Sequence, residues 1–217
     1  MNKKLHKYLQ ARAAKGPCIL SRSDKRNYKA AIVIPALAES KSLPKTLNSL
    51  AENPQEYLQQ TLIIIVINNR IDAPIDQYND NQTTINWLQE NPYPNLNVAW
   101  VDASSKTLVL PKKDGVGLAR KIGFDLALQQ LDWAVTPLLV SLDADTLVEQ
   151  SYLSAIFSHF ETAVCGGATI PFRHQAEANS RHEFAIRNYE LYLRSYLFGL
   201  QRAGSPYAYH TIGSAFA

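Results

Sequence analysis

Cysteine is scarce in this chain. Its 217 residues include two, Cys18 and Cys165, which lie far apart and have no CxxC neighbour. A structural zinc site or a disulfide framework needs more cysteines at closer spacing, so we predict neither. The same cysteine usage fits a reducing compartment.

Long apolar runs are scarce as well. The longest, LIIIVI at residues 62–67, is far shorter than the roughly 20 residues that a membrane-spanning helix needs. The N-terminus has no apolar stretch of the kind found in signal peptides. A GxSxG elbow, a Walker loop and a reactive-cysteine context are also missing from the sequence. We therefore expect a cytoplasmic protein, and none of these three catalytic or nucleotide-binding motifs points to its function.

Positive charge is concentrated at the start of the chain. Residues 1–29 hold nine Lys or Arg and one acid, so this segment carries +8 and the remainder −5 within a net charge of +3. We predict a basic N-terminal arm at 1–29, followed by one domain at 30–217. Such an arm suits an anionic membrane, here its inner face, and a solvated leader is the alternative; nucleic acid is not an expected partner. The apolar residues that would face the membrane at helical spacing are Leu5, Tyr8, Leu9 and Ala13.

The rest of the chain alternates short β-branched runs with longer segments of helical period. This pattern is typical of parallel strands joined by crossover helices, and 46% apolar residues suffice for one sizeable core. We predict an α/β, Rossmann-like fold with a mostly parallel sheet and helices on both faces. The predicted strands are at 30–35, 62–67, 97–102, 138–143 and 163–172, the predicted helices at 41–52, 80–90, 115–131, 149–161 and 176–200, and the predicted loops at 68–82 and 91–95.

The last predicted helix carries an aromatic stripe. Phe184, Tyr189, Tyr192 and Tyr196 lie near one another at helical spacing. We predict that they belong to the core, because such a stripe more often packs inside a protein than binds a ligand.

Polar residues follow the predicted strands at their carboxyl ends. In an open parallel sheet the ligand crevice lies along this edge, so we predict the binding site there. The residues are Glu39 after the first strand, Asn68 and Asn69 after the second, Asp102 after the third, and Asp143 and Asp145 after the fourth.

The stretch LVSLDADTLV at 139–148 places Asp143 and Asp145 one residue apart where an apolar strand ends. Their hard oxygen atoms suit Mg²⁺ or Mn²⁺ bridging a diphosphate. Aspartate before a helix is also a common cap, which is the alternative. We predict a metal site because both carboxylates emerge at the crevice.

A second motif, DGVGLARKIGFDLAL at 114–128, predicts a phosphate site. Its glycines let the backbone approach a ligand, and Arg120 projects from the first turns of the helix. Helix N-terminal amides and an arginine together favour phosphate. The spacing differs from the dinucleotide fingerprint, so a hydride-transfer cofactor is not expected. A plain turn before a helix is the alternative, and for His210, near the C-terminus, we predict a structural role.

Taken in order, five segments resemble the family 2 glycosyltransferases of GT-A fold. They are AAIVIPALAES, IIIVINN, DGVGLARKIGFDLAL, LVSLDADTLV and HTIGSAFA. The resemblance implies that a sugar is transferred from a UDP- or GDP-sugar to a hydroxyl of a glycan or lipid-linked acceptor. It also implies inversion at the anomeric carbon and a divalent metal, Mn²⁺ or Mg²⁺.

The resemblance assigns roles to individual residues as well. Asn68 and Asn69 stand where the family usually has a base-contacting aspartate, so the choice between uracil and guanine stays open. The segments GGATIPF and GSAFA would frame the sugar and acceptor pocket. The implied donor contacts are Pro35, Ala36, Glu39, Asn68, Asn69, Asp114, Gly115, Arg120 and Asp143, and the implied metal ligands are Asp143 and Asp145.

A general base is the missing part of this pattern. Family members continue to an acidic motif that supplies the base, whereas no Asp or Glu follows Glu190 here. We expect a chain that lacks its C-terminal portion, with Glu183 and Glu190 as first candidates if the base lies within it. A non-catalytic sugar-nucleotide-binding or scaffold protein is the alternative. A sugar-1-phosphate nucleotidyltransferase ranks third, because PALAES lacks a glycine-rich loop.

Overall fold

The computed structural model describes residues 3–16, 18–21, 27–90, 93–105, 107–209 and 215–217. The chain forms two compact units, Met1–Cys165 and Gly166–Ala217. The described residues of the basic segment 1–29 belong to the first unit. The structure therefore divides the chain after Cys165, whereas the predicted boundary lies after residue 29.

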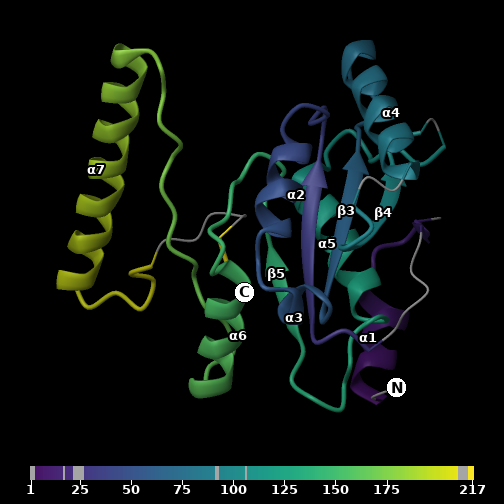
Figure 1. Ribbon diagram of the computed structural model, residues 1–217, viewed down its shortest axis with the longest axis horizontal. Helices are drawn as coiled ribbons and strands as arrows, with labels where there is room; N and C mark the ends of the chain where they lie inside the picture. Colours follow the sequence, from purple (N-terminus) through teal and green to yellow (C-terminus); the bar gives the residue numbers. More distant parts are fainter. Residues whose placement is uncertain (1–2, 17, 22–26, 91–92, 106, 210–214) are drawn as a thin grey trace. The chain divides into compact units, whose positions relative to one another are not determined.

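The elements alternate along the chain as an α/β protein requires (Figure 1). The strands are β1 (Leu20–Ser21), β2 (Ala30–Ala36), β3 (Thr61–Asn68), β4 (Asn97–Ala103) and β5 (Leu138–Ser141). The helices are α1 (Lys3–Arg12), α2 (Leu43–Ala51), α3 (Gln55–Leu58), α4 (Ile75–Gln89), α5 (Val116–Ala127), α6 (Tyr152–Thr162) and α7 (Ser180–Arg202).

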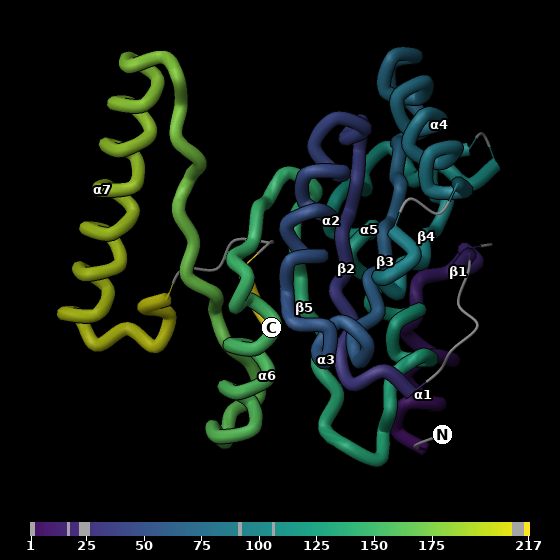
Figure 2. The backbone as a smooth tube through the Cα atoms, viewed as in Figure 1, coloured from purple at the N-terminus to yellow at the C-terminus, as the bar shows by residue number. Residues whose placement is uncertain are grey.

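The strands form one five-stranded sheet in the order β1-β4-β3-β2-β5. β2, β3, β4 and β5 are parallel, and the short β1 pairs antiparallel with β4 at one edge. The chain runs from β2 to β3 and β4 on one side and then crosses to the other side of β2 at β5 (Figure 2). The predicted α/β fold with a mostly parallel sheet is confirmed.

The two central strands are covered on both faces. Every residue of β2 and β3 is buried, as expected for β-branched strands beneath helices on either side. Leu43, Leu47 and Leu50 of α2 are fully buried, and α5 contributes Ala119 and Ile122 to the core. The core therefore fixes the strands whose carboxyl ends carry the predicted site.

Helix α5 approaches the sheet closely at one glycine. A Cβ atom at Gly123 would collide with Val33 Cγ1 and would lie 3.0 Å from Val66 Cγ2. The absence of a side chain at this position therefore lets α5 lie directly on β2 and β3, and it fixes the height of the helix that carries Arg120.

Two predictions of secondary structure are wrong. α4 begins at Ile75, inside the stretch 68–82 that we predict as a loop; its first turns face solvent and lack an apolar period, although Pro74 marks the start. The predicted strand at 163–172 is also absent from the described residues, where Thr169 and Phe216 form an isolated antiparallel bridge. Gly166 and Gly167 weaken strand formation there.

Two of the apolar residues that were predicted to face a membrane, Leu5 and Tyr8, make contacts within the first unit instead. Leu5 is buried, and Tyr8 Oη donates to Asp125 Oδ1 of α5 at 2.8 Å. Asp125 Oδ2 accepts from Ala14 N at 2.7 Å and from Lys121 Nζ at 2.6 Å. This side of α1 therefore contacts α5. None of the helices in the described part of the chain is long and apolar enough to span a membrane.

The second unit contains one long helix. Asn179 caps α7, since its side-chain oxygen accepts from the backbone N–H of Arg181 at 3.0 Å and of His182 at 3.2 Å. The helix therefore begins at Ser180, four residues later than its predicted start.

The aromatic stripe of α7 is exposed. All of α7 is described, and none of its residues is buried. The side chains of Phe184, Tyr189, Tyr192 and Tyr196 are 71%, 53%, 63% and 60% exposed. The prediction that they belong to the core is wrong, because the described part of this unit has no sheet or further helix to cover them.

Candidate active site

A cavity opens at the carboxyl ends of the strands in the first unit. Its volume is about 540 Å³, within the range of small-molecule sites, roughly 300–1,000 Å³. β2 and β5 are neighbours, but the chain leaves β2 toward β3, so the strand order reverses between β2 and β5. Ligands of open α/β sheets bind at such a switch point. The lining residues are Pro35, Leu37, Glu39, Asn68, Arg70, Gln77, Gly115, Val116, Arg120, Asp143, Ala144 and Asp145.

Most of the predicted site residues meet at this cavity, from four different parts of the chain. Three predicted residues are not among those that line it. Ala36 is buried at the end of β2, Asn69 is buried just after β3, and Asp114 is exposed in the turn before α5. The predicted residues that do line the cavity are Pro35, Glu39, Asn68, Gly115, Arg120, Asp143 and Asp145.

Three carboxylates, from Glu39, Asp143 and Asp145, line one cavity. Burial raises the pKa of Glu39, and the negative charges of Asp145, Asp80 and Asp143 raise it further, although a hydrogen bond with Ser42 lowers it. Like charges therefore oppose one another in this space. A cation bound among them would relieve that repulsion.

Arg120 and the start of α5 bring positive charge to the same cavity. The Arg120 side chain is 16% exposed, and its Nη2 donates to Asp143 Oδ1 in a close ion pair. Arg120 Nε is buried and has no hydrogen-bond partner among the described residues. The first N–H groups of a helix also lack intrahelical partners, and Gly115 and Val116 border the cavity. An anion would satisfy these donors.

The sequence analysis did not identify five of the lining residues: Leu37, Arg70, Gln77, Val116 and Ala144. Arg70 follows β3, and its Nε lies 3.4 Å from Asp72 Oδ1. Gln77 belongs to the first turn of α4, within the stretch that we predict as a loop. Pro74, which is favoured at a helix start, is the signal that would have placed Gln77 on a helix.

The loop between β2 and α2 has an unusual backbone. Ala38 adopts a left-handed conformation with φ of 56°, which costs a residue with a Cβ atom roughly 1–3 kcal/mol. Its N–H donates to Asn81 Oδ1 of α4 at 2.9 Å. Two further bonds join Ser40 to Asp80, from the backbone N at 3.0 Å and from Oγ at 2.6 Å. α4 thus holds the loop that carries Leu37 and Glu39.

Asp102 is at a strand end but is not in the cavity lining. Burial alone would raise its pKa, but hydrogen bonds from the hydroxyls and backbone N–H groups of Ser105 and Ser104 outweigh burial and hold the pKa below its usual value. The carboxylate of Asp102 therefore stabilises its own turn.

The carboxylates of the cavity fit a metal ion that is shared with a ligand. Among the residues that the structure describes, no three His, Cys, Asp or Glu side chains are grouped so that they could hold an ion. Mg²⁺ is usually held by one or two carboxylates together with substrate phosphates and waters. Asp143 and Asp145 supply such a pair, which suits an ion arriving with a diphosphate.

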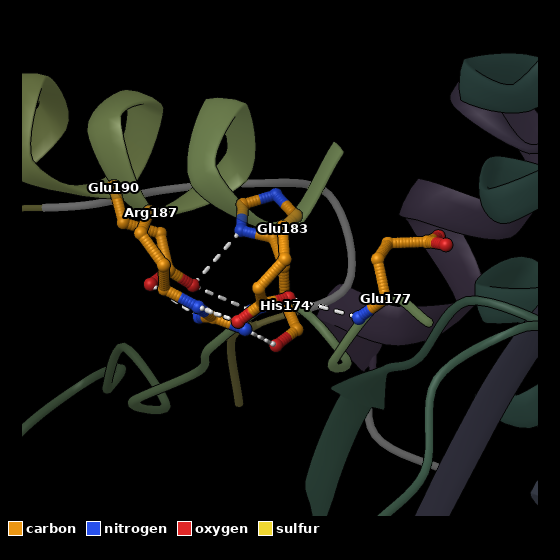
Figure 3. A network of polar contacts seen from close by, with 5 residues as sticks. All are labelled: His174, Glu177, Glu183, Arg187 and Glu190. Atoms are coloured by element: carbon orange, nitrogen blue, oxygen red, sulfur yellow. Dashed lines mark hydrogen bonds and ion pairs between the residues drawn. The ribbon is translucent and has the colours of Figure 1, made fainter. Parts of the chain in front are cut away.

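A network of ion pairs and hydrogen bonds stabilises the second unit (Figure 3). Glu190 Oε1 accepts from His174 N at 2.8 Å, and Arg187 Nη1 donates to Glu190 Oε2 at 2.6 Å. Arg187 Nε donates to Glu183 Oε1 at 2.6 Å, while Glu183 Oε2 accepts from Glu177 N at 2.8 Å. These contacts join the segment before α7 to the helix.

The same contacts disfavour Glu183 and Glu190 as general bases. The backbone N–H of His174 and the Arg187 guanidinium lower the pKa of Glu190 to about 2. The hydrogen bond from Arg187 is the main cause that lowers the pKa of Glu183. A general base works best with a pKa near the working pH, so neither carboxylate suits this role as it stands.

The two segments predicted to frame the acceptor pocket pair with each other. Ala168 N donates to Ala217 O at 2.8 Å, Ala217 N donates to Ala168 O at 3.0 Å, and Ile170 N donates to Ala215 O at 2.8 Å. The described part of GSAFA thus lies beside GGATIPF within the second unit. His210 lies outside the described residues, and its predicted role stays a prediction.

The solved structures that this chain resembles include glycosyltransferases. No protein-family model and no curated protein matches the chain. TarS 1–349 from S. aureus, in complex with UDP-GlcNAc, is 13% identical with a TM-score of 0.43, over 70% of this chain and 36% of that one. The mannosyltransferase PcManGT from Pyrobaculum calidifontis, in complex with GDP-Man and Mn²⁺, is 14% identical with a TM-score of 0.44, over 78% and 41%. This chain thus spans less than half the length of either.

Proposed function

We propose that this chain is the donor-binding part of an inverting glycosyltransferase of family 2 with the GT-A fold. It binds a UDP- or GDP-sugar with Mn²⁺ or Mg²⁺, and the sugar passes to a hydroxyl of a glycan or lipid-linked acceptor. One observation carries the proposal: the acidic and basic side chains that a metal–diphosphate needs line a single cavity at the switch point of the sheet.

The charges of the cavity suit the two halves of a metal–diphosphate ligand. In the structure, Arg120 and Asp143 neutralise each other. With a donor bound, a phosphate would take the place of Asp143 beside Arg120, and Asp143 and Asp145 would be the residues that hold the divalent ion. The exchange leaves neither charge uncompensated, and the unpartnered Arg120 Nε gains an acceptor.

The same residues support the departure of the diphosphate. During transfer the acceptor oxygen bonds to the anomeric carbon while the bond from that carbon to the diphosphate oxygen breaks. Negative charge grows on the departing diphosphate, where Arg120 and the first amides of α5 stabilise it. A divalent ion at Asp143 and Asp145 supplies further charge neutralisation when bound. The proton of the acceptor hydroxyl needs a base that we assign to no described residue.

A non-catalytic protein that binds sugar nucleotides is the second candidate. The observation that favours it is the set of hydrogen bonds from Arg187 and from backbone N–H groups to Glu183 and Glu190, which hold the pKa of both carboxylates low and make them poor general bases. Turnover distinguishes the two candidates, because hydrolysis of a bound sugar nucleotide or transfer from it requires catalysis and binding does not.

The test is calorimetric titration of UDP and of GDP with and without Mn²⁺. Asp145→Asn should lower the Mn²⁺-dependent affinity at least about tenfold, because a charged ligand is lost from a site that neutralises two phosphates. Asp132→Asn, the same change in the loop that precedes β5, should leave the affinity unchanged because Asp132 does not line the cavity. Asp145 does not cap a helix, because the N-cap of α6 is Ser151, so equal affinities of the Asp145→Asn variant and the parent would mean that Asp145 is not a metal ligand.

We also propose that the protein is cytoplasmic and lies at the inner face of a membrane through its basic arm. Lys3, Lys4 and Lys7 of α1 are exposed, which supports an electrostatic contact. Each basic residue near an anionic surface contributes about 1 kcal/mol. Replacing all three by Glu should abolish sedimentation with anionic vesicles at low salt, and unchanged sedimentation would contradict the proposal.

A further inference from the structure

Helix α4 connects two of the strand ends that border the cavity, those of β2 and β3. Asn81 is 1% exposed and bridges two segments that are distant in the sequence. Its Oδ1 accepts from Ala38 N at 2.9 Å, and its Nδ2 donates to Asn68 O at 3.0 Å. Ala38 lies in the loop after β2, whereas Asn68 ends β3, so one side chain fixes the distance between them.

The loop that Asn81 holds is strained. Ala38 has a φ of 56°, which residues with a Cβ atom adopt only where surrounding contacts impose it. The contacts that impose it here come from α4: Asn81 accepts from Ala38 itself, and Asp80 accepts from Ser40. Leu37 and Glu39, on either side of Ala38, both line the cavity. The strained residue, Ala38, therefore lies between two residues that line the cavity.

We propose that Asn81 is a positioning residue for nucleotide binding. It holds residues 37–40 and the end of β3 in the ligand-binding arrangement before the ligand arrives, so that binding does not have to order them. Preorganisation of this kind raises affinity by lowering the cost of ordering. The inference rests on the proposed function, and it names the residue that shapes the β2–β3 side of that cavity.

Two variants with different effects on stability test the role. Asn81→Asp keeps an acceptor for Ala38 N but removes the donor to Asn68 O and sets a carboxylate against that carbonyl, so Tm should fall. Ala38→Gly removes the steric strain, so Tm should stay equal or rise. Asn81→Asp loosens residues 37–40 and should weaken the binding of UDP or GDP with Mn²⁺ threefold or more. Ala38→Gly keeps both bonds of Asn81 and adopts the same φ without strain, so it should bind at least as tightly as the parent.

Matched controls separate positioning from stability. Asn79→Asp makes the same change on an exposed position of α4, and Ile85→Val removes one methyl group from the buried face of that helix. Neither should change the affinity, although Ile85→Val should lower Tm. All titrations are run well below the Tm of each variant, so that every variant is folded during the measurement.

The outcomes decide the inference in each case. Affinity that falls in Asn81→Asp but not in Ala38→Gly, Asn79→Asp or Ile85→Val supports it. Affinity that follows Tm across the four variants, or stays unchanged, overturns it. A parent that binds neither nucleotide overturns the proposed function and the inference with it. If Asn81→Asp does not fold, Asn81→Ser takes its place: its shorter side chain cannot make both bonds, so the same loss of affinity supports the inference and unchanged affinity overturns it.

Discussion

The cavity of the first unit and the network on α7 both gather charged side chains, but they compensate those charges differently. In the cavity, Arg120 Nε lacks a partner among the described residues and the pKa of Glu39 is raised. On α7, Glu183 and Glu190 are bonded to Arg187 and to backbone N–H groups, and their pKa values are lowered.

We propose that this difference distinguishes the candidate binding site from a structural clamp. A raised pKa means that the charged form of a carboxyl group is destabilised, so a bound cation can stabilise it. A carboxylate that already has cationic and N–H partners gains little from a further ligand. Charged residues of similar type therefore have opposite uses in the two units, and their partners decide which.

The largest effect that we expect is the loss of diphosphate binding on removal of Arg120. Arg120→Ala deletes the cation of the cavity and leaves Asp143 without its partner, so the affinity for UDP or GDP with Mn²⁺ should fall about 100-fold, as when one member of a hydrogen-bonded charge pair is truncated. Calorimetric titration measures the change.

Lys113→Ala, which removes a charge from an exposed position in the preceding turn, is the matched control and should lower the affinity less than threefold. An Arg120→Ala variant that binds as tightly as the parent would mean that the cavity, like α7, holds only a structural ion pair.

A smaller effect is expected from the close approach of α5 to the sheet. Gly123→Ala places a Cβ atom against Val33 and Val66, so the free energy of unfolding should fall by about 1–3 kcal/mol despite the better helix propensity of alanine. Urea denaturation of the chain measures it.

Gly117→Ala is the control for this change on the same helix. Apart from its chain neighbours and the backbone of its own helix, no described atom lies within 4 Å of a Cβ placed there, so this variant should be as stable as the parent or up to about 1 kcal/mol more stable. If both alanine variants have the same stability, close packing does not set the position of α5.

The smallest effect concerns the pH dependence of the clamp on α7. The pKa of Glu190, about 2, lies below its ordinary value, so the carboxylate stabilises the folded unit above the ordinary pKa and this contribution disappears as the pH falls through about 2. Arg187→Gln should shift the midpoint upward, because one of its causes is removed. Carboxyl ¹³C NMR titration gives the midpoint directly.

Arg181→Gln removes the same charge from the first turn of α7 and should leave that midpoint in place. A midpoint that does not change on loss of Arg187 would show that His174 holds the pKa down, through its backbone N–H and its imidazole, and the contrast between the clamp and the cavity would then rest on that residue.

The sequence predicted the strands better than the helix starts. β-branched runs must be buried on both sides, which leaves few alternatives for β2 and β3. The start of α4 could not be found from periodicity, because its first turns face solvent and carry polar residues such as Asp76 and Asn79. Gln77 was missed as a cavity residue for the same reason.

What the sequence determined by itself is which side chains stand at the carboxyl ends of the strands, because a run of β-branched residues ends where Glu39, Asn68 or Asp143 follows. Tertiary structure decided the rest. It set Arg120 against Asp143, let Asn81 join two strand ends, and left the aromatic stripe of α7 exposed. Local periodicity determines which residues share a face of a helix or strand. Whether that face is covered, and whether a charged side chain finds a partner of opposite charge, depends on segments that are distant in the sequence.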